Sequence, residues 1–198
     1  MITNFLRQAA AGLRVLLALT VVAGALYPLA VWAVAHLAFP HQANGSKVTD
    51  HGRTVGSSLL GQDFTGRRWF HSRPSAAGSG GGYDALASGA SNLGPRNHEL
   101  LTQVRQRQAA AAARDGTAPS HVPAEALTAS GSGLDPHISP RYARQQATRV
   151  ATARGLADRR VRELVEDHVE GRVLGFLGEP RVNVLELNLA LEQLAGKG

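Results

Sequence analysis

The feature that most constrains this chain is an uninterrupted apolar run near its N-terminus. Residues 15–39 read VLLALTVVAGALYPLAVWAVAHLAF and contain no Asp, Glu, Lys or Arg. About 20 predominantly apolar residues are enough to cross the hydrocarbon core of a bilayer as a helix. We therefore predict that residues 15–39 form a transmembrane helix.

A proline interrupts this predicted helix near its middle. Pro28 has no backbone N–H and usually kinks a helix, so one carbonyl loses its partner within the helix. A neighbouring helix can satisfy that carbonyl. Pro28 is therefore a candidate contact with a membrane partner, although a simple anchor with a tolerated kink explains it equally well.

Two arginines, Arg7 and Arg14, precede the apolar run with no acidic residue near them. By the positive-inside rule they place residues 1–14 in the cytoplasm and residues 40–198 outside it. The same arginines could begin a secretory signal, with the small residues AVA at 33–35 as its cleavage site. The apolar run exceeds the ~7–15 residues of such a signal, so we predict an uncleaved anchor. A periplasmic binding module released by cleavage is the alternative.

The part of the chain after the span is long enough for one soluble domain with its own core. The whole chain has 21 basic and 15 acidic residues and no cysteine, which excludes disulfides and thiolate sites. A nucleic-acid reader clusters its arginines on one face and interleaves aromatic residues, whereas the arginines here are scattered along the whole chain, as Arg7, Arg53, Arg96, Arg114, Arg141, Arg159 and Arg172 show. We therefore predict no nucleic-acid partner.

Periodicity and punctuation predict an α+β fold for this extracytoplasmic domain. Residues 41–52 are polar and turn-rich, which predicts a linker, and a strand-and-turn region should follow. Residues 78–97 are too rich in Gly, Ser, Asn and Pro for regular structure. Ser139, Pro140 and Gly155 mark the ends of one helix. The expected elements are helices at 99–114, 140–154 and 158–170 and a bulged strand at 182–191.

One polar segment has the residue types of a hydrolase. Ser130, Ser132, Asp135 and His137 lie within a few positions of one another. Triad members normally converge from distant positions, and Ser132 lacks the first glycine of a nucleophile elbow. We therefore predict no catalytic residue, and an anchored extracytoplasmic serine hydrolase is the alternative. The histidines show no metal-ligand spacing and no glycine-rich segment completes a phosphate loop, so no metal site is predicted.

Seven short segments follow the predicted span in a specific order: 56–62 (GSSLLGQ), 69–75 (WFHSRPS), 91–95 (SNLGP), 128–140, 149–151, 153–156 and 177–185 (LGEPRVNVL). Together they resemble the C-subunit family of Kdp-type potassium-transporting ATPases, over nearly the full chain. The positions that the resemblance singles out are Gly61, Gln62, His71, Arg73, Pro74, Asn92, Gly94, Asp135, His137 and Asn183.

The resemblance implies a single-pass subunit of a potassium uptake pump in the bacterial inner membrane. Its partners would be a channel-like A subunit that selects potassium, a B subunit that hydrolyses ATP and a small F subunit. The chain has no DKTGT string, which contains the phosphorylated aspartate of P-type pumps. It is therefore expected to be a non-catalytic accessory subunit that stabilises assembly, with no tightly bound cofactor.

The resemblance also implies a catalytic-chaperone role, in which the subunit raises the ATP affinity of the B subunit. ATP would lie at their interface, with Gln62 as a nucleotide contact. Because ATP is cytoplasmic, a domain beyond the membrane cannot touch it, so contacts through the helix and outside the cytoplasm are the preferred expectation. The other nine positions are expected to brace the fold or to dock partners, and Arg73 could brace it by pairing with Asp135.

Overall fold

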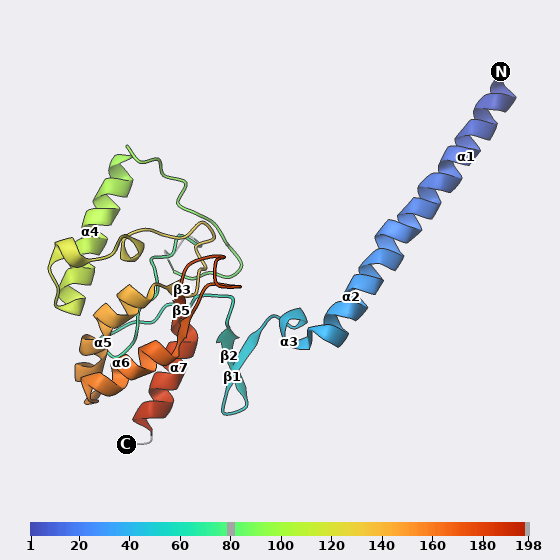
Figure 1. The fold of residues 1–198 in the computed structure, drawn as a ribbon. Helices are drawn as coiled ribbons and strands as arrows, with labels where there is room; N and C mark the ends of the chain where they lie inside the picture. The colour runs from blue at the N-terminus through green and yellow to red at the C-terminus, as the bar shows by residue number, and fades with distance from the viewer. Residues whose placement is uncertain (79–81, 197–198) are drawn as a thin grey trace. The chain divides into compact units, whose positions relative to one another are not determined.

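The computed structural model describes residues 1–78 and 82–196 (Figure 1). It divides into two units, Met1–Ser46 and Lys47–Gly198. The fold is α+β, as predicted, with one long apolar N-terminal helix and small sheets. Of the predicted loop at 78–97, residues 79–81 lie outside the described residues, and the described remainder contains no helix or strand.

The first unit is a continuous helix followed by one short helical turn. Its elements are α1 (Ile2–Val21), the π-helical η1 (Val22–Leu26), α2 (Tyr27–Ala38) and α3 (Pro40–Ala43). The run from Ile2 to Ala38 has 37 residues and is about 55 Å long, which exceeds the ~30 Å hydrocarbon core. Its most apolar window is 0% buried within the structure, so these side chains need lipid or another protein around them.

Pro28 explains why the helix changes type. In an α-helix a proline ring clashes with the carbonyl four residues earlier, which here belongs to Gly24. The π-turn of η1 lies directly before this point, and Tyr27 donates its N–H to the carbonyl of Val22, five residues back. The wider turn accommodates the ring, and the helix then continues to Ala38.

The second unit begins with an antiparallel hairpin of β1 (Lys47–Asp50) and β2 (Arg53–Ser57). His51 and Gly52 join the strands, and both have positive φ, as a two-residue hairpin turn requires. The linker predicted over 41–52 is therefore wrong in its second half. The side chains of β1 are mostly polar, so no apolar pattern in the sequence predicts this strand. In the structure they alternate between exposed and half-buried positions.

A three-stranded antiparallel sheet lies elsewhere in the second unit, in the order β3-β5-β4. The strands are β3 (His137–Ile138), β5 (Arg181–Asn183) and β4 (Val169–Glu170). His137 lies opposite Asn183 in this sheet, so two site candidates that are far apart in the sequence become neighbours.

Among the described residues, four longer helices and two short 3-10 turns complete the second unit. They are α4 (His98–Asp115), η2 (Pro119–His121), η3 (Ala124–Ala126), α5 (Pro140–Arg154), α6 (Asp158–Asp167) and α7 (Val184–Ala195). The helices predicted at 99–114 and 140–154 are confirmed within one residue. The third ends at Asp167, three residues early, because the next residues leave the helix to form β4.

The core lies where α5, α6 and α7 meet, the orange-to-red helices of Figure 1. The helix α5 contributes Tyr142 and several alanines, which let its neighbours approach closely. Among the described residues of the unit, the largest fully buried apolar side chains are Phe70, Ile138, Tyr142, Val150, Val161, Val165, Val182, Val184, Leu187 and Leu191.

The strand predicted at 182–191 is wrong beyond its first two residues. The strand β5 ends at Asn183, and α7 begins at Val184. Apolar and polar residues alternate at the start of this segment, which imitates a strand. Leu187 and Leu191 are nevertheless four residues apart and both fully buried, as one face of a helix requires.

Candidate functional site

Helix side chains bind the backbone of the segment 67–75, which is not part of a sheet. Asn188 of α7 accepts the N–H of Phe70 at 2.9 Å and donates to its carbonyl at 3.0 Å. Gln146 of α5 makes the same two bonds with His71, at 2.7 and 3.0 Å. Both amides are almost fully buried. Each carboxamide replaces the backbone of an adjacent strand and fixes the segment in place.

A buried arginine holds the start of the same segment. Arg149 of α5 donates to the carbonyls of Arg67 and Trp69 at 2.5 and 2.9 Å, and to the carboxylate of Asp115 at 2.8 Å. The two charged side chains of this ion pair are almost fully buried. Burial lowers the pKa of the Arg149 guanidinium, and the Asp115 charge opposes that shift. Breaking such a pair would leave an uncompensated buried charge.

Arg73 comes from one segment of the chain, and Asp135 and His137 come from another that is distant in sequence, but the three side chains meet. Nη1 of Arg73 lies 3.1 Å from Oδ2 of Asp135, and Nδ1 of His137 lies 3.3 Å from Oδ1. Burial alone would raise the pKa of Asp135, but hydrogen bonds from His137 and the positive charge of Arg73 outweigh it and hold that pKa below its usual value. The carboxylate therefore stays charged and joins the two segments.

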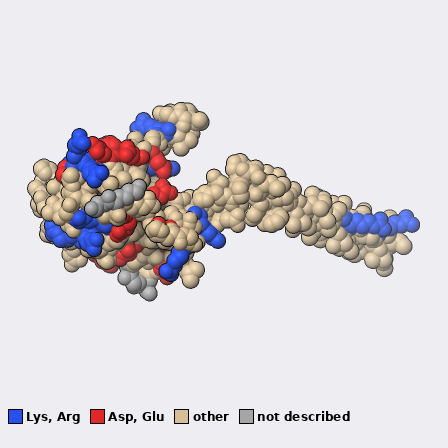
Figure 2. All heavy atoms as spheres, turned by 90° about the horizontal axis from the view of Figure 1, so that it is seen from below, with Lys and Arg blue, Asp and Glu red and all other residues tan. Residues whose placement is uncertain are grey.

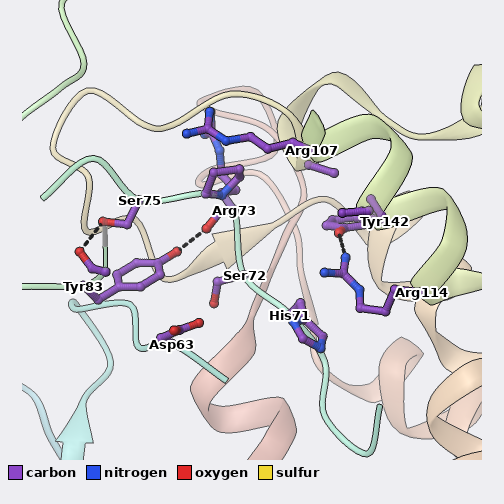
Figure 3. Close-up of a pocket in the computed structure, with 14 residues that line it drawn as sticks. Asp63, His71, Ser72, Arg73, Ser75, Tyr83, Arg107, Arg114 and Tyr142 are labelled. Carbon is purple, nitrogen blue, oxygen red and sulfur yellow. Dashed lines mark hydrogen bonds between the residues drawn. The ribbon is translucent and has the colours of Figure 1, made fainter. Parts of the chain in front are cut away.

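A cavity of about 210 Å³ lies beside the segment 67–75 (Figure 3). Its volume is below the ~300–1,000 Å³ that is usual for sites of drug-sized ligands. The guanidinium of Arg114 donates to the hydroxyl of Tyr142 at 2.8 Å. The polar and charged lining consists of Asp63, His71, Ser72, Arg73, Ser75, Tyr83, Arg107, Arg114 and Tyr142.

The titratable groups of this cavity are poorly suited to proton transfer near neutral pH. Burial, and then the charges of Arg114 and Arg149, lower the pKa of His71 to about 4. Burial raises the pKa values of Tyr83 and Tyr142 to about 12. A general acid or base works best when its pKa lies near the operating pH, and here all three pKa values are shifted away from neutrality. The arrangement suits packing better than catalysis.

Gly61 and Gln62 connect the end of the hairpin to the Asp135 loop. A Cβ at Gly61 would come within 2.8 Å of the Asp135 carbonyl oxygen and would overlap the ring of Tyr83. Gln62 donates its Nε2 to the carbonyl of Val55 in β2 at 2.8 Å. Among the described residues, Gln62 is not one that lines the 210 Å³ cavity.

Asn183 bonds three other backbone groups. Its Oδ1 accepts the N–H groups of Leu185 and Glu186 at 3.1 and 3.3 Å, which caps the N-terminus of α7. Its Nδ2 donates to the carbonyl of Ser58, beyond β2, at 2.8 Å. One buried amide therefore joins β5, α7 and the segment after the hairpin.

The structure does not gather all predicted positions. Pro74 lines the cavity beside Arg73, whereas Asn92 and Gly94 are exposed in the loop before α4. Asn92 has a φ of 52°, a region that asparagine tolerates better than most residues. The Gly94 carbonyl accepts the N–H of Asn97, the N-cap of α4, at 3.0 Å. These two positions shape a loop away from the cavity.

The serines of the hydrolase alternative make local loop contacts. Oγ of Ser132 accepts the N–H of Leu134 at 3.1 Å. Oγ of Ser130 lies 3.4 Å from Oγ of Ser132. His137 turns its Nδ1 to Asp135. In the described part of the chain, the two serines line one hollow and His137 lines another. A nucleophile needs its base within hydrogen-bond reach, so this arrangement does not support a serine hydrolase.

Sequence reasoning missed the residues that position the site, namely Gln146, Arg149 and Asn188. Their signal was present, because Gln146 and Arg149 lie three residues apart beside Ala143 and Val150 on the buried face of α5. Long polar side chains on an otherwise apolar helix face indicate that the helix binds something polar in the core.

Known proteins match this chain over almost its whole length. The family model described as "K+-transporting ATPase, c chain" matches residues 9–193. The curated relatives include proteins of Kineococcus radiotolerans, 60% identical over 98% of this chain and 97% of the relative, and of Streptomyces coelicolor, 49% identical over 100% and 97%. A protein of Mycobacterium tuberculosis is 51% identical over 95% of this chain and 99% of its own length. All three are named "Potassium-transporting ATPase KdpC subunit".

Proposed function

The chain belongs to the KdpC family of potassium-transporting ATPase subunits, and on that premise we propose that it is the membrane-anchored subunit that stabilises assembly of the pump. It catalyses no reaction of its own in this proposal. Its partners are the channel-like A subunit, the ATP-hydrolysing B subunit and the small F subunit.

One observation carries this proposal above the others. The polar residues with the chemistry of a site bind other parts of the same domain, as in the Arg73–Asp135 pair and the Asn183 cap. The apolar helix, in contrast, has no buried residue in its most hydrophobic window in the isolated chain. The polar side chains of the domain stabilise the domain itself, whereas the apolar helix needs lipid or another protein around it. This combination suits a structural subunit better than an enzyme.

The helix spans the bacterial inner membrane once in this proposal, with its N-terminus in the cytoplasm. Arg7 and Arg14 precede the apolar run, and in Figure 2 the long middle stretch of the helix shows no charged side chain on the visible face. The positive-inside rule then favours a domain outside the cytoplasm. Pro28 and the π-turn before it mark the part of the helix that contacts a neighbouring membrane helix, because the carbonyl of Gly24 has lost its α-helical partner.

The assembly role is tested by deleting this chain alone in cells that carry the other pump subunits. The measurements are growth at limiting potassium and recovery of the remaining subunits through a tag on the B subunit. We expect loss of both, and expression of the full chain from a plasmid should restore both. Normal growth with an intact complex would overturn the proposal.

A catalytic-chaperone effect on ATP affinity is a finer proposal with its own test. The apparent KM for ATP is measured on the purified pump with the native chain and with Gln62→Ala, and Gln103→Ala on α4 serves as the control. A higher KM for Gln62→Ala alone would support Gln62 as the nucleotide contact. Equal KM values in a fully assembled pump would remove Gln62 from that role.

A further inference from the structure

The segment between β4 and β5 forms a small hairpin of its own. Val173 donates its N–H to the carbonyl of Leu177 at 2.9 Å, and Leu177 donates back at 3.0 Å. Leu174, Gly175 and Phe176 make the turn, and the first two have φ values of 54° and 81°. Outside the turn, Arg172 and Glu179 form an ion pair at 2.9 Å. We call residues 173–177 the apolar hairpin.

The apolar hairpin exposes large hydrophobic side chains at adjacent positions. The exposed fractions are 55% for Val173, 80% for Leu174, 69% for Phe176 and 50% for Leu177. A leucine with positive φ is also unfavourable, and the turn holds Leu174 in that conformation. Scattered exposed apolar residues are ordinary, whereas a contiguous group on an ordered hairpin marks an interaction site.

The charges around the hairpin argue against lipid as its occupant. Arg172 is paired with Glu179, and Arg181 with Glu170 at 2.9 Å, so the two arginines that flank the hairpin in sequence are paired within the domain. A segment that binds anionic headgroups normally presents an excess of unpaired basic residues. An apolar centre with a charge-balanced polar rim is instead the anatomy of a protein interface.

We propose that the apolar hairpin inserts into an apolar recess on a membrane-embedded subunit of the same pump, on the part of that subunit that projects from the bilayer. This inference rests on the proposed function, because it needs a pump to dock on. The hairpin is preformed, so little ordering entropy opposes binding. The chain is already held in the same membrane, so even a small contact becomes effective through a high local concentration.

The first experiment compares the double variant L174D/F176D with a matched control in the full chain. Leu86→Asp is the control, because Leu86 is likewise an exposed apolar residue but lies in a different loop. Copurified pump subunits are quantified after detergent washing, with the melting temperature of each purified chain as the check on folding. We expect recovery to fall about tenfold or more for L174D/F176D and to stay at the native level for Leu86→Asp.

The second experiment identifies the occupant directly. A photoreactive amino acid replaces Leu174 in the full chain, and the crosslinked product is identified in native membranes. An adduct with a membrane-embedded pump subunit supports the proposal. Adducts only with lipid, or only with a second copy of this chain, would overturn it.

The two proposals fail in different ways. If deletion of the chain leaves the pump intact, the assembly role itself is wrong. If deletion abolishes assembly but a folded L174D/F176D variant assembles normally, the assembly role stands and the docking surface lies elsewhere.

Discussion

The Asn188 side chain makes the two backbone hydrogen bonds with Phe70 that an adjacent strand would otherwise make. It satisfies both backbone groups of Phe70, and all of these groups are buried. Asn188→Ala would leave a buried N–H and a buried carbonyl without partners, which should destabilise the fold by about 2–4 kcal/mol. Gln193→Ala, exposed on the same helix, is the control. Thermal unfolding of the full chain in detergent measures both, and similar melting temperatures would contradict this role.

Gly61 and Gly94 were singled out together by sequence, but they stand in different surroundings. A Cβ at Gly61 meets the Asp135 carbonyl and the Tyr83 ring, whereas a Cβ at Gly94 has no heavy atom within 4 Å. Gly61→Ala should therefore cost about 1–3 kcal/mol of stability. Gly94→Ala should be neutral or slightly stabilising. Chemical denaturation of the two variants side by side checks this, and equal costs would refute the distinction.

His71 gives the domain a pH-dependent stability. Its pKa in the folded chain is about 4, below the ordinary value of 6.5, so between these values the unfolded chain binds a proton that the folded chain does not. The stability present above pH 6.5 is therefore lost as the pH falls towards 4, by on the order of 2 kcal/mol. His71→Gln should flatten the melting temperature over this range, whereas His121→Gln, exposed in η2, should not. Parallel curves for all three chains would exclude His71 as the cause.

At the scale of elements, Asn183 couples a strand, a helix and the segment after the hairpin. Asn183→Ala loses both the cap of α7 and the bond to Ser58, so we expect a cost of about 1–3 kcal/mol. Asn183→Asp retains an oxygen for the cap and loses only the donor. Its stability should lie between those of Asn183→Ala and the native chain in thermal unfolding. An aspartate variant as unstable as the alanine variant would show that the bond to Ser58 dominates.

The sequence predicted the elements whose ends are marked by capping and helix-terminating residues. The helix α5 was predicted with its bounds, because Ser139, Pro140 and Gly155 define it locally. The hairpin strand β1 and the helix α7 were missed for the opposite reason: β1 lacks an apolar pattern, and the start of α7 alternates like a strand. Asn183 with Glu186 three residues later has the form of an N-terminal cap, and this local signal marks the start of α7.

The site was less predictable than the elements. Arg73 and Asp135 could be paired in advance, because an arginine and an aspartate in polar loops invite a salt bridge. The bonds of Gln146 and Asn188 to a backbone more than 70 residues away could not, because they depend on how α5 and α7 pack. The exposure of the apolar hairpin was equally hidden, since Val173 and Phe176 resemble core residues in sequence.

At the scale of the whole molecule, the chain separates two tasks. The first unit is a helix with its apolar surface outward, and the second is a domain whose polar clusters bind one another. In our proposals each unit contributes one contact, the first through the helix flank around Pro28 and the second through the apolar hairpin. Two weak contacts on one chain can hold a complex more firmly than either alone, which is what a subunit for assembly requires.

Membrane orientation is the prediction with the widest consequences, and the absence of cysteine makes it measurable. Thr3→Cys and Ser120→Cys place single thiols at exposed positions in the two units. With the outer membrane opened, an impermeant maleimide should label Ser120→Cys at once and Thr3→Cys only after lysis, because Arg7 and Arg14 favour a cytoplasmic N-terminus. The reverse pattern would bring Gln62 within reach of cytoplasmic ATP. The expected pattern confines any effect on ATP affinity to contacts made by the helix or relayed through a partner.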